Sequence, residues 1–187
     1  MTHVGTLRIV AGRLKGRKIP VTDEPELRPT GDRVREAIFN ILGQDLTGCR
    51  VLDLYAGTGA LGFEALSRGA TAVVFVEATP RIAATIRRSA ETLGVAPEIR
   101  VVVGRVEEVL DRSKLGGPFE IILADPPYRK EARTGLVEAV DSGRVLALHG
   151  TLIVERETRS PAPDGTAGLR LVRTAKYGRS SLDFFKY

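Results

Sequence analysis

RVLDLYAGTGALGFEALSRGATAVVFVE, residues 50–77, is the stretch that decides the fold. An apolar run that includes Asp53 leads into a glycine-rich turn, and an amphipathic segment follows until Gly69. A second apolar run then ends at Glu77. Apolar runs that alternate with amphipathic helices indicate parallel strands covered on both faces. The segment therefore predicts a strand–helix–strand unit of an α/β fold.

The alternation continues along the chain and predicts the topology of the sheet. Apolar runs at 99–103, 119–125 and 150–156 repeat the strand pattern. Two last strands, 169–178 and 181–187, leave no room for a helix between them, so we expect an antiparallel hairpin. The prediction is a mostly parallel seven-stranded sheet that ends in this hairpin. One helix is expected between Thr79, its cap, and Gly94, with Pro80 in its first turn. Two shorter helices are expected near 106–110 and 135–139.

Two elements are expected before the sheet. Residues 7–21 alternate short β-rich pieces with Gly12 and Gly16, which is typical of a small hairpin. Residues 27–43, LRPTGDRVREAIFNILG, predict an amphipathic helix with Thr30 or Asp32 as its cap. We therefore expect a basic N-terminal arm, residues 1–28, and a larger domain, residues 29–187.

Charge and cysteine content restrict the function further. The net charge is +5, and the first twenty residues hold five of the basic side chains and no acid, which favours a polyanionic partner. The one cysteine, Cys49, allows neither an intramolecular disulfide nor a Cys-based metal cluster, and we expect it to be buried beside a strand. We predict no metal site. With no apolar leader and no run of membrane-spanning length, we expect a cytoplasmic protein with no membrane partner.

Acidic residues occur at the ends of three predicted strands: Asp53, Glu77 and Asp125. The carboxyl ends of parallel strands share one edge of the sheet, and ligands of such sheets bind there. One acid at a strand end is often only a helix cap. Three along one edge, beside a glycine-rich turn, indicate a binding site.

The turn itself, AGTGALGFEA, satisfies G-x-G-x-x-G with Gly57, Gly59 and Gly62, and Glu77 stands where a ribose-binding acid is expected. A dinucleotide such as NAD fits this pattern. Asp53 weighs against it, because a carboxylate opposes a pyrophosphate that a glycine loop would otherwise favour. A ligand with an ammonium group and no phosphate suits Asp53 better. S-adenosylmethionine, which has an amine, a sulfonium and a ribose, is such a ligand.

The strand 119–125 ends in an unusual turn, Asp125-Pro126-Pro127-Tyr128. Proline has no N–H and a fixed φ, so Pro126 offers a rigid carbonyl without a competing donor. That carbonyl and the Asp125 carboxylate can accept two hydrogen bonds from one planar amine. Tyr128 can stack on the flat ring that carries the amine. The turn therefore predicts a site that binds a flat ring carrying a planar amine.

These motifs give the chain a family resemblance. It resembles the Rossmann-like, S-adenosylmethionine-dependent class I methyltransferases that carry [ND]-P-P-[YFW], and more narrowly the bacterial 16S rRNA guanine-N2-methyltransferases. LRIVAGRLKGRKI, LRPTGDRVREAIFNIL, VLDLYAGTGALGFEALSRGA, ILADPPY and KYGRSSLDFF carry the resemblance, in that order along nearly the whole chain. The first two segments are the more discriminating, because the others occur in many methyltransferases.

The resemblance implies a role for each matched position. Gly57 and Gly59 would let the backbone approach the cofactor, Asp53 would face its methionine end, and Glu77 would bind the ribose. Related enzymes often hold the adenine amine with an acid after the third strand, where this chain has Arg105, so backbone near Val106 would hold the adenine instead. The predicted cofactor-binding set is Thr30, Arg33, Asp53, Tyr55, Gly57, Thr58, Gly59, Glu77, Arg105 and Val106, and the predicted catalytic set is Asp125, Pro126, Pro127 and Tyr128.

The implied substrate is a guanine in a hairpin of 16S rRNA, methylated within the small ribosomal subunit or its assembly intermediate. We expect the enzyme to be a monomer, because it must dock on a much larger particle. A base must leave its stack to reach such a pocket, and a hairpin loop offers splayed bases at low cost. The residues expected to contact the RNA are Arg8, Arg13, Lys15, Arg17, Lys18, Arg28, Arg129 and Lys130.

Three alternatives stay open at this point. A DNA adenine or cytosine amino-methyltransferase shares D-P-P-Y, although 187 residues leave little room for a target-recognition region. An NAD-dependent oxidoreductase could use the same glycines, but His3 and His149 lie in a terminus and a predicted turn, away from any hydride-handling position. The third is a non-catalytic RNA-binding protein that has kept the cofactor fold.

Overall fold

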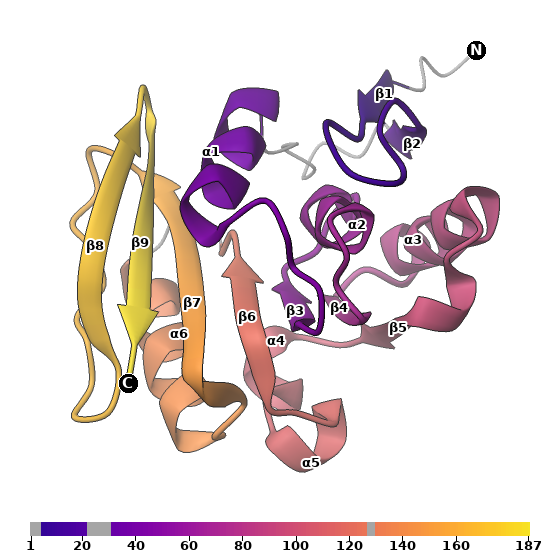
Figure 1. Ribbon diagram of the computed structural model, residues 1–187. Helices are drawn as coiled ribbons and strands as arrows, with labels where there is room; N and C mark the ends of the chain where they lie inside the picture. The colour runs from indigo at the N-terminus through magenta and orange to yellow at the C-terminus, as the bar shows by residue number, and fades with distance from the viewer. Residues whose placement is uncertain (1–4, 22–30, 127–129) are drawn as a thin grey trace.

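The computed structural model describes residues 5–21, 31–126 and 130–187 and has a seven-stranded sheet at its centre. The strand order is β5-β4-β3-β6-β7-β9-β8, with β5 to β7 parallel and β9 antiparallel to both of its neighbours (Figure 1). The predicted sheet and its C-terminal hairpin are thereby confirmed. The strands are β3 (Arg50–Leu54), β4 (Ala72–Glu77), β5 (Ile99–Val103), β6 (Phe119–Ala124), β7 (Leu146–Glu157), β8 (Arg170–Tyr177) and β9 (Ser180–Lys186).

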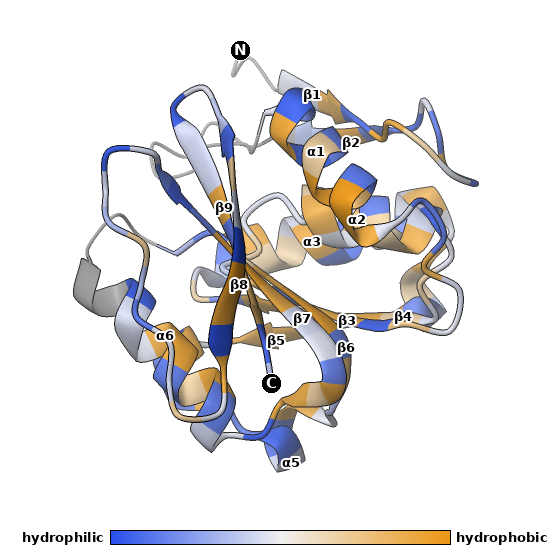
Figure 2. Ribbon diagram, turned by 60° about the vertical axis from the view of Figure 1, so that its left-hand side comes forward, coloured by the Kyte–Doolittle hydropathy of each residue, from blue (hydrophilic) through white to orange (hydrophobic). Residues whose placement is uncertain are grey.

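Helices cover both faces of this sheet, as the turned view in Figure 2 shows. Each face buries its own apolar cluster, so nearly every residue of the central strands contributes to one core or the other. The first face carries α1 (Asp32–Leu42), α2 (Ala60–Ser67) and α3 (Pro80–Leu93), followed by the short η1 (Ala96–Glu98). The second face carries α4 (Val106–Val109), α5 (Arg112–Leu115) and α6 (Lys130–Ser142).

The helix ends show which cap predictions hold. Asp32 is the first helical residue of α1, and its N-cap is Gly31, so the expected Asp32 cap is wrong; Thr30 lies outside the described residues. Thr79 does precede α3, but its side chain makes no capping hydrogen bond. α5 was not predicted from the sequence; its cap Asp111 accepts hydrogen bonds from two backbone N–H groups of the first turn.

The N-terminal arm is a real hairpin, with β1 (Gly5–Arg8) antiparallel to β2 (Lys18–Val21). Ile9, Leu14 and Ile19 of the arm are buried in the same apolar cluster as α1 and α2. The arm therefore shares the core of the first face, although the sequence suggested a separate appendage.

Three further expectations concern the burial of Cys49, helices that could span a membrane, and groups of metal ligands. Cys49 is only half-buried, so it is less enclosed than expected, and burial raises the pKa of its thiol with smaller contributions from Glu120 and Asp45. Among the described residues, no helix is both long and apolar enough to cross a bilayer. Nor do three His, Cys, Asp or Glu side chains in that part of the chain form a group that could hold a metal ion.

Candidate functional site

The register of the central strands places the predicted acids along one edge of the sheet. Leu54 of β3 pairs with Val76 of β4 on one side and with Ala124 of β6 on the other. The next residues, Glu77 and Asp125, therefore flank Tyr55 where the three strands end. The structure thus brings the acids together at the edge that the sequence indicated.

Asp53 lies on β3, two residues before Tyr55 at this edge, and is almost entirely buried. Its Oδ2 atom accepts a hydrogen bond from the Gly62 N–H, 3.0 Å away, which joins β3 to the first turn of α2. Burial chiefly raises the pKa of Asp53 to about 8; the hydrogen bond from Gly62 opposes the rise, and the charges of Glu77 and Asp125 add to it. The carboxyl group is thus held in place and is poorly solvated, which favours a cationic ligand group beside it.

Glu77 links the glycine turn to the start of α3. Its Oε2 atom accepts the Gly57 N–H at 2.9 Å, and its Oε1 atom accepts the Thr79 N–H at 2.8 Å. The residue is only 8% exposed. A carboxylate has about four acceptor positions, so two remain for the hydroxyl groups of a ligand.

The three glycines of the turn serve different purposes. Gly57 and Gly59 have φ of 53° and 75°, in the left-handed region that favours glycine, and Gly59 starts α2. A Cβ atom at Gly62 would lie 2.2 Å from the Phe75 ring, so this glycine lets α2 pack closely on β4. Thr58 between them is buried. Gly57 and Gly59 thus set the backbone conformation of the turn, and Gly62 allows α2 to pack closely on β4.

Tyr55 forms a second wall of the edge. It is one of two non-glycine residues of the described chain with positive φ, 58°, a conformation that costs energy and that structures retain mainly at functional sites. Its hydroxyl donates to Glu107 Oε1 at 3.0 Å, and burial raises its pKa, with Glu107 adding to the effect. Val106 is buried beneath this wall, whereas the Arg105 side chain is 72% exposed, near the Glu107 carboxylate.

The remaining predicted residues of the edge are only partly described. Asp125 is half-buried after β6, and Pro126 is buried. Pro127, Tyr128 and Arg129 lie outside the described residues, as do Arg28 and Thr30. Arg33 is exposed in the first turn of α1, and Lys130 is the first residue of α6.

The structure adds one acid that the sequence analysis missed, Glu155 of β7. Ala124 pairs with Val154, so Glu155 stands beside Asp125 on the neighbouring strand. Glu155 is half-buried, and its Oε2 atom has no hydrogen-bond partner among the described residues. Burial raises its pKa, and a hydrogen bond with Ser180 opposes the rise. The available signal was an acid directly after the apolar residues 152–154, but such an acid is also compatible with the end of an ordinary strand.

The basic arm is attached to α2 by hydrogen bonds that the sequence did not reveal. Glu64 accepts the N–H groups of Val10 and Ala11 at 2.8 and 3.0 Å. Ser67 accepts the Arg13 N–H through its carbonyl and the Leu14 N–H through its hydroxyl, at 2.7 and 2.9 Å. The loop of the arm is therefore fixed against the carboxyl end of α2.

This attachment divides the predicted RNA-contacting residues of the arm into two groups. Arg13 pairs with Glu98, and Arg17 donates to the Thr92 carbonyl at 2.7 Å. Arg8, Lys15 and Lys18 are exposed, and no contact of their side chains with described residues is seen. The side chains of the second group are therefore not neutralised by any acid among the described residues.

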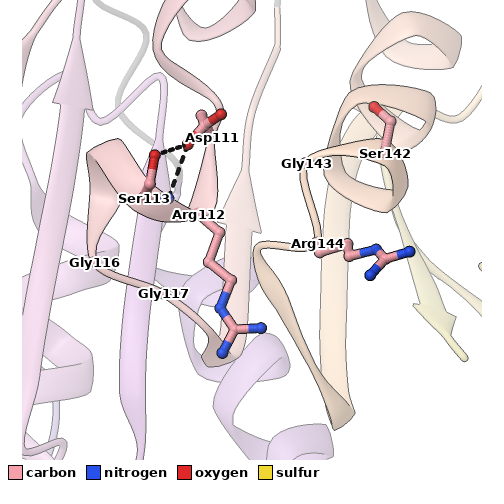
Figure 3. A pocket seen from close by; sticks show the side chains of 8 residues that line it. All are labelled: Asp111, Arg112, Ser113, Gly116, Gly117, Ser142, Gly143 and Arg144. Atoms are coloured by element: carbon pink, nitrogen blue, oxygen red, sulfur yellow. Dashed lines mark hydrogen bonds between the residues drawn. The ribbon is translucent and has the colours of Figure 1, made fainter.

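A hollow lies at the opposite edge of the sheet, where β6 and β7 begin (Figure 3). Its lining comes from α5 with its flanking residues and from the end of α6, joined by a hydrogen bond from the Arg112 N–H to the Gly143 carbonyl at 3.3 Å. The Arg112 and Arg144 side chains extend in different directions rather than converging (Figure 3). This hollow is therefore separate from the acidic edge and has no set of groups aimed at one ligand.

Comparison with known proteins gives a consistent result. The family model described as conserved hypothetical protein 95 matches residues 7–186. "Ribosomal RNA small subunit methyltransferase D" of Escherichia coli K12 is 35% identical over 175 residues, covering 94% of this chain and 87% of that protein. The Haemophilus influenzae protein of the same description is 34% identical over 158 residues, covering 84% of this chain and 82% of its own.

Solved structures agree with the sequence relatives. Escherichia coli yhhF superposes with a TM-score of 0.86 at 31% identity, covering 97% of both chains. A Salinibacter ruber RNA methyltransferase, solved with S-adenosyl-L-homocysteine, has a TM-score of 0.65 at 16% identity, covering 84% of this chain and 92% of its own. At that identity the likeness concerns the fold alone. The predicted Rossmann-like methyltransferase fold is confirmed.

Proposed function

Because this chain belongs to the family of the small-subunit ribosomal RNA methyltransferase D proteins, we propose that it methylates the exocyclic N2 amine of a guanine in a 16S rRNA hairpin loop, with S-adenosylmethionine as the methyl donor. The family membership supports rRNA methylation. The amine as the target rests on Asp125 and Pro126, which follow β6 at the acidic edge. That placement is the observation that carries the proposal.

The acidic edge fits S-adenosylmethionine by its charge and by its acceptors. Burial chiefly raises the pKa of Asp53 and the nearby charges of Glu77 and Asp125 add to the rise, so the edge favours a ligand with positive charge. Glu77, already holding the Gly57 and Thr79 N–H groups, would accept the ribose hydroxyls, and the Tyr55 and Val106 side would face the adenine. When bound, the cofactor supplies an electrophilic methyl group on a cationic sulfur.

The reaction asks little acid–base chemistry of the protein. The guanine amine is a poor nucleophile, because its lone pair is delocalised into the ring. Hydrogen bonds from this amine to the Asp125 carboxylate and the Pro126 carbonyl would orient it and favour a more pyramidal nitrogen. As positive charge develops on that nitrogen, the Asp125 carboxylate would stabilise it, and the proton becomes acidic only then.

The arm supplies the contact with RNA in this proposal. Arg8, Lys15 and Lys18 are exposed on a hairpin that is fixed to the carboxyl end of α2, and no acid among the described residues pairs with them. Residues 1–28 would therefore hold the rRNA while residues 29–187 carry the chemistry. A base inside a small ribosomal subunit or its assembly intermediate is the proposed target, and a monomer is the proposed state of the enzyme.

Methyl transfer to small subunits from a strain that lacks this activity tests the proposal. We would digest the RNA to nucleosides after incubation with methyl-labelled S-adenosylmethionine. Label should appear in N2-methylguanosine, and the Asp125→Ala variant should keep less than about a tenth of the rate, since removing a key catalytic contact costs at least that much. The exposed Asp164→Ala serves as the matched control.

The same experiment separates the alternatives. Label in another nucleoside would reject the guanine amine but keep the methyltransferase. Label in DNA and not in RNA would favour the DNA amino-methyltransferase instead. An Asp125→Ala variant with near-normal turnover would reject the role given to this carboxylate.

A further inference from the structure

Glu155 is a half-buried residue with a buried Oε2 atom, and the chemistry proposed above gives this carboxylate no role. Native proteins leave few buried polar atoms without a partner, because each such atom loses its hydrogen bonds to water and destabilises the fold. Oε2 of Glu155 is such an atom within the described chain, and the apolar residues 152–154 precede it on β7. A polar group that is kept at this cost suggests a partner that arrives with a ligand.

The strand register shows where that partner would be. Ala124 pairs with Val154 on parallel strands, which lie about 4.8 Å apart, so Asp125 and Glu155 follow as neighbours. Leu123 and Ile153 both belong to the cluster under α1 and α2, and side chains alternate between faces along a strand. Glu155 and Asp125, each two residues further on, therefore share that face at the carboxyl edge.

We propose that Glu155 is the residue that selects guanine, by accepting a hydrogen bond from the N1–H of the target base. This inference rests on the proposed function and names the contact that would give it specificity. Guanine has a ring N–H donor directly beside its exocyclic amine. Adenine and cytosine have a ring nitrogen acceptor at the equivalent place, which an ionised carboxylate repels. With the amine on Asp125 and Pro126, the adjacent ring position falls toward the neighbouring strand, where Glu155 stands.

Other groups on the same face do not supply this acceptor. Glu77 already receives two backbone N–H groups on the far side of Tyr55, and Asp53 is engaged by Gly62 below the edge. Ser180 lies on β9 beside β7 and affects only the pKa of Glu155, whereas the Oε2 atom of Glu155 has no partner among the described residues. That atom is therefore the acceptor on this face that the described chain leaves without a donor.

The test uses small subunits rebuilt around 16S rRNA whose ligated synthetic segment carries either guanine or 2-aminopurine at the target position. 2-Aminopurine keeps the exocyclic amine but has an acceptor at N1. The intact wild-type protein should methylate guanine with a kcat/KM about 10- to 100-fold higher, as expected for loss of one buried hydrogen bond to a charged group. This comparison needs no variant, so protein folding cannot confound it.

The variants then assign the preference to one side chain. Glu155→Gln has nearly the same shape, and its amide can donate to the N1 acceptor of 2-aminopurine, so the guanine preference should fall at least about tenfold. Glu157→Gln, exposed two residues along the same strand, should keep the wild-type ratio. An unchanged ratio in Glu155→Gln, or a wild-type protein that does not distinguish the two bases, would overturn the inference while methylation of guanine still upholds the proposed function. A wild-type protein that leaves guanine unmethylated would instead overturn the proposed function.

Discussion

The Glu64 carboxylate and the Arg68 guanidinium meet 2.9 Å apart in the interior, with 1% and 3% of their side chains exposed. The same carboxylate accepts the N–H groups of Val10 and Ala11, and Arg68 lies over the Phe39 ring, 4.8 Å from its centroid. One buried ion pair thus joins α2 to the arm and to α1. The arm that we propose to hold RNA is therefore positioned by the helix that follows the glycine turn.

The docking of the arm on α2 should be most sensitive to a substitution at Gly12. A Cβ atom there would lie 1.8 Å from the Ser67 carbonyl oxygen, so Gly12→Ala requires the arm to move away from α2. We expect a lower free energy of unfolding and weaker RNA binding, with cofactor affinity retained. Denaturant unfolding and RNA titration of the same preparation measure both effects.

Gly16→Ala is the matched control for this change. Gly16 has φ of 82°, close to the 78° of Gly12, but nothing lies within 4 Å of its Cβ position. The free energy of unfolding of this variant should therefore fall by only about 1–2 kcal/mol, the cost of placing alanine in the left-handed conformation. Equal losses in the two variants would show that the contact with Ser67 does not hold the arm.

The exposed cations of the arm should determine the salt dependence of RNA binding. Lys15→Ala and Lys18→Ala should each reduce the slope of log affinity against log salt by about 0.7, the value for one contact with single-stranded phosphate. Lys114→Ala, exposed in α5 at the opposite edge of the sheet, should leave the slope unchanged. Slopes that stay at the wild-type value in both arm variants would mean that the arm's charge faces solvent only.

Glu77→Gln should weaken cofactor binding without unfolding the protein. The glutamine oxygen can accept only one of the two N–H groups that Glu77 now holds, and its NH2 group would face the other donor. We expect the Kd for S-adenosylmethionine to rise about 10- to 100-fold, the usual worth of hydrogen bonds to a charged group. Calorimetric titration measures it, with Glu91→Gln on the exposed side of α3 as the control. A Kd equal to that of wild type would separate Glu77 from the cofactor.

Features that repeat along the chain could be predicted from the sequence. Alternating apolar runs and amphipathic helices gave all seven strands of the sheet and the final hairpin, because burial on both faces leaves a periodic trace. The edge position of Asp53, Glu77 and Asp125 followed from parallel strand direction alone. α5, only four residues long, left too short a pattern to be recognised.

Contacts between distant residues could not be predicted in the same way. Glu64 looks like an ordinary helix acid in ALGFEALS, and only the fold places it against Val10, 54 residues earlier. Glu155 is similar, since its place beside Asp125 depends on which strand becomes the neighbour of β6. Strand order is a property of the whole chain, so no local motif reports it.

Asp53→Asn should change how the stability of the protein depends on pH. The pKa of Asp53 is about 8 in the folded protein, against a reference value of 3.8, chiefly because of burial. Between these two values the unfolded chain binds fewer protons at this position than the folded chain. The free energy of unfolding therefore falls as pH rises, by at most about 1.4 kcal/mol per pH unit from this group.

Asparagine does not titrate and keeps an oxygen that can accept the Gly62 N–H, so the variant should lack this loss. We expect the stability of Asp53→Asn relative to wild type to increase steadily when urea unfolding is repeated from pH 5 to pH 8. Parallel stability curves across that range would mean that Asp53 ionises normally in the folded protein. In that case burial and the charges of Glu77 and Asp125 would not act on it as the structure indicates, and the edge would be better solvated than its geometry implies.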